Sequence, residues 1–172
     1  ITGWNIQIFD IPYLYNRTIR LFDQKEARRL SPWRLINERT TQLRGKDITF
    51  HDIIGISVID YIDVYRRNSP PAESYRLDYI ASIELGQKKL SFEEYGTLHT
   101  LYKENFQKFI DYNIKDVQLV ERLEEKKKLI EMVVALAYEA KVNYQDTFGM
   151  VMMWEVILAN DLMNRKIVVP PK

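Results

Sequence analysis

The sequence predicts a globular α/β domain in which a mixed sheet is flanked by helices and extended by a β-hairpin. Three observations favour this class. An apolar, β-branched stretch, ITGWNIQIF, leads into a helical pattern, two strand-like runs flank a glycine turn, and a long amphipathic pattern covers about residues 98–123. With 172 residues, of which 46% are hydrophobic and 28% charged, the chain can bury one core. We therefore expect a single domain over residues 1–172.

The stretch GWNIQIFD, residues 3–10, has the composition of a short buried strand that ends in Asp10. Pro12 follows where a helix tolerates proline, and apolar residues recur at helical spacing to about residue 24. The pattern predicts a strand, a tight turn and a helix, with Asp10 at the sheet edge where ligands bind in α/β folds. The alternative is that Asp10 caps the helix by accepting backbone N–H bonds.

A β-hairpin is predicted at about residues 36–50, because LINERTTQL and DITFHDI flank RGK, whose glycine can supply the positive φ of a turn. The next run, GISVIDYIDVYRR, is rich in Ile and Val and predicts a central strand. In such a strand Asp60 and Asp63 point to opposite faces. We therefore expect them to pair with Arg66 or Arg67 and to make loop contacts rather than to bind metal.

Helical patterns fill the second half of the chain. SYRLDYIASIEL predicts a short helix that ends at Gly86. The helix at about residues 98–123 carries apolar positions 106, 109, 110, 114, 117 and 120. A last helix, at about residues 147–166, is apolar nearly all round, which favours packing against other protein. The chain opens without methionine inside a strand pattern and closes on VVPPK, so we expect a piece of a longer protein.

Composition excludes several classes of site. The formal charge is +1, so no overall field attracts nucleic acid or anionic membrane, and any basic surface is local. Without cysteine there is no disulfide, thiolate metal site or cysteine nucleophile, and two histidines exclude a histidine-rich site. The sequence contains no run of 18 apolar residues, the length that a membrane-spanning helix needs. A metal ion would have to be held by oxygen atoms.

The sequence YNIKDV places Tyr112 and Asp116 four residues apart in the strongest predicted helix. Side chains at this spacing share one helix face, so a phenol and a carboxylate stand one turn apart. Read alone, the pair is an ordinary surface aspartate beside a partly buried tyrosine.

Together the two stretches are more specific. NIQIFD, with Asn5, Phe9 and Asp10, and YNIKD, with Tyr112 and Asp116, resemble the second and third exonuclease motifs of family B DNA polymerases. RLSPW, GISVIDYIDVYRR and SYRLDYIASIELG extend the resemblance to the exonuclease domain of T4-like bacteriophage polymerases over essentially the whole chain.

The resemblance implies a ribonuclease-H-like fold and 3′→5′ removal of mismatched primer ends, with two Mg²⁺ or Mn²⁺ ions held by four carboxylates. Asp10 and Asp116 are two of these ligands, and Tyr112 orients the attacking water or the scissile phosphate. Hard divalent ions on carboxylate oxygens suit the hydrolysis of an anionic phosphodiester. Asn5 and Phe9 belong to the DNA-binding surface, with Phe9 packed beneath the site.

The family's first exonuclease motif, an Asp-x-Glu pair on an earlier strand, has no counterpart in these residues. We therefore expect the first strands and half of the two-ion site to be missing, and the isolated chain to be inactive or weakly active. The resemblance also implies partners: the single-stranded 3′ primer end, the remainder of the polymerase chain, and a replisome clamp reached through other regions. It places the protein in the cytoplasm of an infected bacterium, without membrane contact.

The hairpin corresponds in the family to one that helps part primer from template. Arg39, Arg44 and Lys46 lie on it and are expected to touch DNA phosphates, the alternative being a soluble edge hairpin. Two rival functions remain open: a non-catalytic DNA-binding or structural fragment without a complete metal site, and a helical protein-interaction module built on the apolar helix near Trp154.

Overall fold

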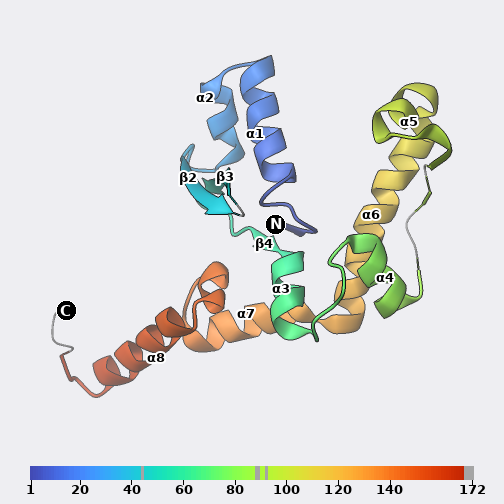
Figure 1. Ribbon diagram of the computed structural model, residues 1–172. Helices are drawn as coiled ribbons and strands as arrows, with labels where there is room; N and C mark the ends of the chain where they lie inside the picture. Colours follow the sequence, from blue (N-terminus) through green and yellow to red (C-terminus); the bar gives the residue numbers. More distant parts are fainter. Residues whose placement is uncertain (44, 88–89, 92, 169–172) are drawn as a thin grey trace. The chain divides into compact units, whose positions relative to one another are not determined.

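The computed structural model describes residues 1–43, 45–87, 90–91 and 93–168, in which strands and helices both occur (Figure 1). The strands are β1 (Thr2–Gly3), β2 (Ile36–Leu43), β3 (Lys46–Ile53) and β4 (Ile59–Asp60). The α-helices are α1 (Asp10–Leu21), α2 (Gln24–Ala27), α3 (Tyr61–Asn68), α4 (Leu77–Leu85), α5 (Leu98–Glu104), α6 (Phe106–Lys127), α7 (Leu129–Ala140) and α8 (Met150–Asn164). Short 3₁₀ turns are η1 (Arg28–Leu30), η2 (Glu93–Tyr95) and η3 (Tyr144–Phe148).

The α/β class is confirmed, and the chain divides into two compact units. The first is Ile1–Asp60 together with Ile130–Lys172, and the second is Tyr61–Leu129. In the first unit β1 pairs with β4 in parallel and β2 pairs with β3 antiparallel. Among the described residues these pairs form two separate two-stranded sheets, where the sequence predicted one mixed sheet.

The predicted strand through Asp10 is wrong beyond Gly3, because a buried carboxylate accepts the backbone N–H groups that a neighbouring strand would otherwise bind. Asp60 is 3% exposed, and its Oδ1 and Oδ2 accept the N–H groups of Asn5 at 2.7 Å and Gln7 at 3.1 Å. Amide groups that would pair with a neighbouring strand are thus satisfied by one side chain. Asn5 adopts a φ of 65° and the chain turns, so Asp10 begins α1 instead of ending a strand.

The central strand predicted from GISVIDYIDVYRR is also wrong, since only Ile59–Asp60 is extended and α3 follows at once. The segment buries Tyr61, Val64 and Tyr65, which have the i, i+3, i+4 spacing of a helix face. Asp63 lies 3.9 Å from Arg66, as predicted, but on a helix. Asp60 makes the expected loop contacts, because its carboxylate accepts the backbone amides of Asn5 and Gln7.

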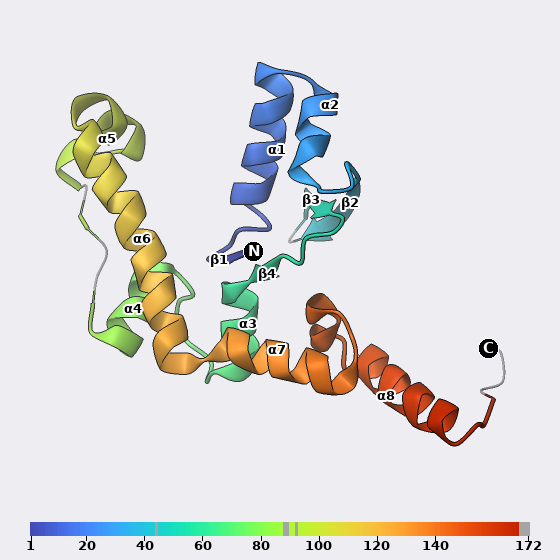
Figure 2. The same ribbon diagram turned by 180° about the vertical axis from the view of Figure 1, so that it is seen from behind.

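The hairpin is confirmed, with Ile36 opposite Ile53 and Leu43 opposite Lys46. Gly45 has a φ of 75°, the left-handed conformation that the turn requires. The hairpin lies beside α1 and α2, as both views show (Figures 1 and 2). A small apolar cluster closes this part of the unit: Ile6, Ile11, Ile53 and Val58, with Ile56 packed against it.

In the second unit α6 packs against α4 and α5 (Figure 2). The predicted helix at 98–123 is interrupted at Asn105, which ends α5 and caps α6 by accepting the N–H of Lys108 at 3.0 Å. The predicted apolar stripe is partly wrong, because Ile114 is 50% and Val117 69% exposed. The buried positions of α6 are Tyr112, Leu119 and Leu123.

The last helix, α8, falls inside the predicted range and buries none of its residues. Its exposed apolar side chains are Met150, Val151, Met152, Trp154, Leu158 and Met163. In the described part of the chain, none of the helices combines the length and apolarity needed to cross a membrane.

We expect Asp60→Ala to lower the free energy of unfolding by about 3 kcal/mol, because each amide left without its acceptor costs about 1–3 kcal/mol. Urea denaturation followed by circular dichroism measures the change. Asp63→Ala is the matched control and should cost less than about 1 kcal/mol, since its ion pair with Arg66 is exposed. Equal losses for both variants would contradict the role given to Asp60.

Candidate active site

Asp10 is the first residue of α1, and its carboxylate is exposed at the helix start. The N-cap position belongs to Phe9, so the alternative that Asp10 is the capping residue is not what the structure has. Partial desolvation raises the pKa of the Asp10 carboxyl, and a hydrogen bond from its own backbone amide opposes this. The positive end of the helix dipole favours a negative charge at this position. Asp10 is therefore placed to accept a cation or a polar ligand from solvent.

Asn5 and Phe9 shape the turn before Asp10. The Asn5 carbonyl accepts the Phe9 N–H at 3.1 Å, while the Asn5 N–H donates to Asp60. The prediction that Phe9 packs beneath the site is wrong, because its side chain is 67% exposed. The apolar positions on either side, Ile6 and Ile11, fill the core instead. Phe9 thus presents an open aromatic face.

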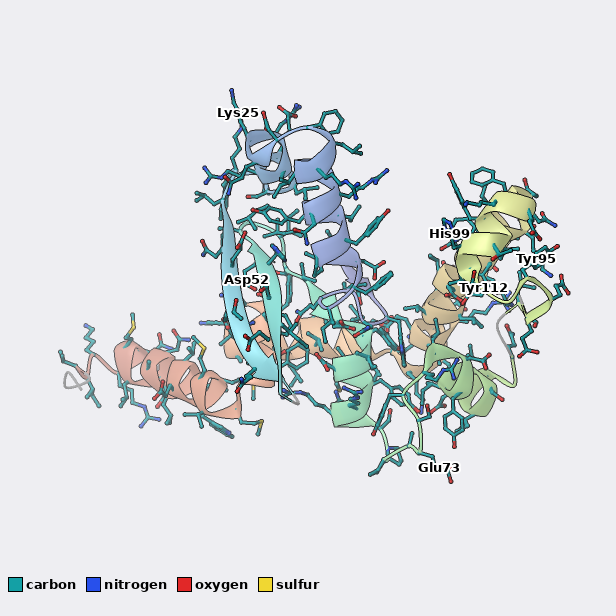
Figure 3. The ribbon with its side chains drawn as sticks, turned by 45° about the horizontal axis from the view of Figure 1, so that its top comes forward. Lys25, Asp52, Glu73, Tyr95, His99 and Tyr112 are labelled. Atoms are coloured by element: carbon teal, nitrogen blue, oxygen red, sulfur yellow. The ribbon has the colours of Figure 1, made fainter. Side chains whose placement is uncertain are left out.

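Tyr112 and Asp116 lie on one face of α6, in the second unit (Figure 3 labels Tyr112). Tyr112 is 9% exposed, and one carboxylate oxygen of Asp116, Oδ1, is shielded from solvent. The same face carries Leu119 and Leu123, both fully buried. A carboxylate on a buried helix face has a desolvation cost that a surface aspartate lacks. The pair is therefore not the ordinary surface arrangement.

The predicted residues fall into two groups. Asn5, Phe9 and Asp10 come together in the first unit, and Tyr112 and Asp116 in the second. Neither unit, over its described residues, gathers three histidine or acidic side chains that could hold a metal ion. The pairing of Asp10 with Asp116 around a cation stays a prediction.

Of the predicted DNA-contacting cations on the hairpin, Arg39 has a described side chain. Its guanidinium lies over the Phe50 ring at 5.0 Å, and its Nε is 3.8 Å from Asp52 Oδ2. Asp52 lies on β3 (Figure 3). Arg44 lies outside the described residues, and Lys46 lies in β3 with its side chain outside them. Arg39 is exposed, and its guanidinium contacts the side chains of Phe50 and Asp52 on β3.

Sequence reasoning missed the contact that joins the hairpin to α1. The Tyr15 hydroxyl donates to Glu38 Oε1 at 3.0 Å, and its ring lies 4.4 Å from the ring of His51. His51 is a buried residue of β3. Tyr15 follows Asp10 by five residues on α1, so the hairpin and Asp10 belong to one connected arrangement. The recurrence of Ile11 and Tyr15 at i, i+4 was the available signal.

Residues 1–80 match the exonuclease domain of DNA polymerase family B. The whole chain is also similar to the DNA-directed DNA polymerase of Escherichia phage RB69, with 37% identity over 174 residues. The chain is homologous to the exonuclease region of family B DNA polymerases.

The match to the RB69 polymerase covers 99% of this chain and 19% of that protein. The DNA-directed DNA polymerase of Enterobacteria phage T4 is 30% identical over 173 residues, which is 98% of this chain and 19% of that protein. The chain thus spans about a fifth of the length of these polymerases. The exonuclease-domain match includes Asp10 and the hairpin, and the polymerase relatives extend the similarity through Tyr112 and Asp116.

The C-terminal end of α6 is held by a partly buried carboxylate that sequence reasoning did not identify. Glu84 of α4 accepts the Tyr65 hydroxyl at 2.7 Å and pairs with Lys127 at 2.6 Å and Lys126 at 3.4 Å. Burial alone would raise the pKa of Glu84, but Lys127, Tyr65 and Lys126 together lower it. The network joins α3, α4 and α6, the helix that carries Tyr112 and Asp116.

We expect Glu84→Gln to lower the free energy of unfolding by about 2 kcal/mol at pH 7, since hydrogen bonds to a charged group contribute about 1.5–3 kcal/mol. Because the folded pKa is lowered, the contribution of the carboxylate is complete above the ordinary value of about 4.3 and is lost as the pH falls below it. Urea denaturation at several pH values should therefore show the difference from wild type shrinking below about pH 4.

Glu94→Gln is the control, because that carboxylate is 62% exposed in its ion pair with Lys108. Its effect should stay below about 1 kcal/mol at pH 7. A Glu84→Gln difference that is independent of pH would contradict the role of the charge.

Proposed function

We propose that this chain forms part of the proofreading 3′→5′ exonuclease of a family B DNA polymerase in phage DNA replication. The observation that carries the proposal is that Asp10 lies inside the exonuclease-domain match, while the homologous region continues through a tyrosine and a partly buried aspartate one helical turn apart. We further propose a ribonuclease-H-like arrangement for the complete domain, with DNA and the remaining polymerase chain as partners. A clamp contact through other regions and a location in the cytoplasm of the infected host belong to the same proposal.

The donor chemistry fits a divalent cation such as Mg²⁺ or Mn²⁺. The chain has no cysteine, and the ligands offered by Asp10 and Asp116 are carboxylate oxygens, which hard ions prefer. Asp10 and Asp116 would be two of the holding residues, completed by carboxylates outside this chain. When bound, the ions supply Lewis-acid chemistry at the scissile phosphate. Such ions bind the charged form of a carboxylate, so cation binding opposes the desolvation that raises the pKa of Asp10.

Tyr112 has a different duty. A phenol is protonated at neutral pH and can both donate and accept a hydrogen bond. One turn before Asp116, its hydroxyl can orient water or a phosphate oxygen without abstracting the proton as a strong base. Exposed Phe9, at the start of α1, offers its ring to an unpaired nucleobase.

A chimera tests the activity. The segment of the RB69 polymerase that matches this chain is replaced by residues 1–172, and release of the 3′-terminal nucleotide from a labelled single-stranded oligonucleotide is followed with Mg²⁺. Asp10→Asn and Asp116→Asn should each slow release by about 100-fold or more, because a lost ligand removes stabilisation of the developing charge. Tyr112→Phe should cost about 10-fold, which corresponds to one hydrogen bond.

Primer extension by the same chimera is the internal control and should be unchanged in all three variants. A chimera that extends primers but releases no 3′ nucleotide would overturn the exonuclease assignment. That outcome would favour the second candidate, a non-catalytic DNA-binding fragment, which the lack of an acidic triplet within either unit's described residues supports.

The hairpin makes a separate prediction about DNA affinity. Arg39→Ala in the chimera should weaken primer–template binding and lower the slope of log affinity against log salt by about 0.9, the value for one phosphate contact on duplex DNA. Arg29→Ala is the matched control, an exposed arginine of the same unit paired with Glu26 at 2.7 Å. Fluorescence anisotropy across a salt series measures both. Identical slopes would show that Arg39 does not contact phosphate.

A further inference from the structure

One face of α6 carries basic residues at heptad spacing: Lys108, Lys115 and Arg122, followed by Lys126. Lys108 forms an ion pair with Glu94, and Lys126 with Glu84. Lys115 and Arg122 differ from these neighbours. Among the described residues, both donate hydrogen bonds to a neutral amide, that of Gln87.

Lys115 and Arg122 converge on one atom. Lys115 Nζ donates to Gln87 Oε1 at 3.2 Å, and Arg122 Nη1 donates to the same oxygen at 2.5 Å. The two cationic nitrogens are thus less than about 6 Å apart, although their Cα atoms lie about 10.5 Å apart along the helix. Two like charges drawn together around an uncharged acceptor repel each other. An oxyanion at that point would be attracted by both.

The end of α4 explains only part of this arrangement. Gly86 closes α4 in the left-handed conformation with a φ of 65°, and Gln87 follows directly. The carboxyl end of a helix carries about half a negative charge. Lys115 and Arg122 bring two full positive charges to the Gln87 amide, more than this partial charge can balance.

We propose that Lys115 and Arg122 form a binding site for a phosphodiester of single-stranded DNA, with the Gln87 amide held in the place of the phosphate oxygens. Arginine binds phosphate through paired N–H groups and lysine as a point charge. Lys115 and Arg122 lie on α6, the same helix that carries Tyr112 and Asp116. The inference rests on the proposed function, because it names where α6 holds the substrate strand.

The test is binding without cleavage. A fluorescein-labelled dT₁₂ is titrated with the full 172-residue chain in EDTA, and anisotropy is measured at several salt concentrations. Lys115→Gln/Arg122→Gln should weaken binding about 10-fold or more at low salt. The slope of log affinity against log salt should fall by about 0.7, because the two cations share one phosphate and each phosphate contact on a single strand contributes about 0.7.

Lys103→Gln/Lys25→Gln removes two exposed charges elsewhere and is the matched control. The charge-preserving Lys115→Arg/Arg122→Lys should keep most of the affinity, and thermal melts show whether each variant is folded. Equal weakening by the control pair, or unchanged binding in Lys115→Gln/Arg122→Gln, would overturn the site. If the glutamine variant melts early, loss of affinity in the folded charge-preserving variant would overturn it too.

Competitors identify the ligand. Unlabelled dT₁₂ should displace the probe at a far lower concentration than inorganic phosphate does, because the neighbouring phosphates of a strand add to the electrostatic attraction. Displacement by poly-L-glutamate as readily as by dT₁₂ would assign the site to an acidic polypeptide and overturn the proposal. This assay measures binding and not cleavage. Failure of the Lys115 and Arg122 site would therefore leave the nucleotide-release result in the chimera unchanged, so the two proposals are tested separately.

Discussion

The carboxylate of Asp60 is the interaction on which the first unit depends. It stands at the end of β4, next to the two-residue parallel pairing with β1, and accepts two backbone amides from the turn that follows β1. The turn sets the start of α1 and therefore the position of Asp10. Ile6 and Ile11, on the same segment, then reach the cluster with Ile53 and Val58. One acidic side chain thus sets the direction of the backbone, the packing of the apolar cluster and the position of the candidate metal ligand Asp10.

The second unit uses the same device in a different setting. Glu84, on α4, receives a tyrosine hydroxyl from α3 and two ammonium groups from α6. In each unit a carboxylate that accepts several donors joins segments that are distant in the sequence. In α6, which carries Tyr112 and Asp116, this network holds the C-terminal end, and the side chain of Asn105 caps the N-terminal end.

Local patterns in the sequence predicted the elements whose cause is local. The hairpin follows from turn chemistry at Gly45, and α4 follows from a helical pattern closed by Gly86. The strand through Asp10 was not predictable in its true form, because its hydrogen-bond acceptor, Asp60, lies 55 residues from Asn5. A tertiary contact at that separation leaves no periodic signal. The candidate site shows the same division: the spacing of Tyr112 and Asp116 was visible, but the burial of their helix face depends on α4 and α5, while Ile114 and Val117 remain exposed.

The break at Asn105 has a consequence for how related chains can differ in length. Asn105 ends α5 and starts α6, so the phase of α6 is counted from this residue. A residue inserted directly before Asn105 lengthens α5 and leaves the phase of α6 unchanged. A residue inserted between Asn105 and Tyr112 rotates everything after it by about 100°, which turns Tyr112 and Asp116 away from the buried face while leaving both in the sequence. Related chains can therefore gain or lose residues ahead of Asn105. The interval from Asn105 to Asp116 must keep its length for Tyr112 and Asp116 to stay on the buried face of α6.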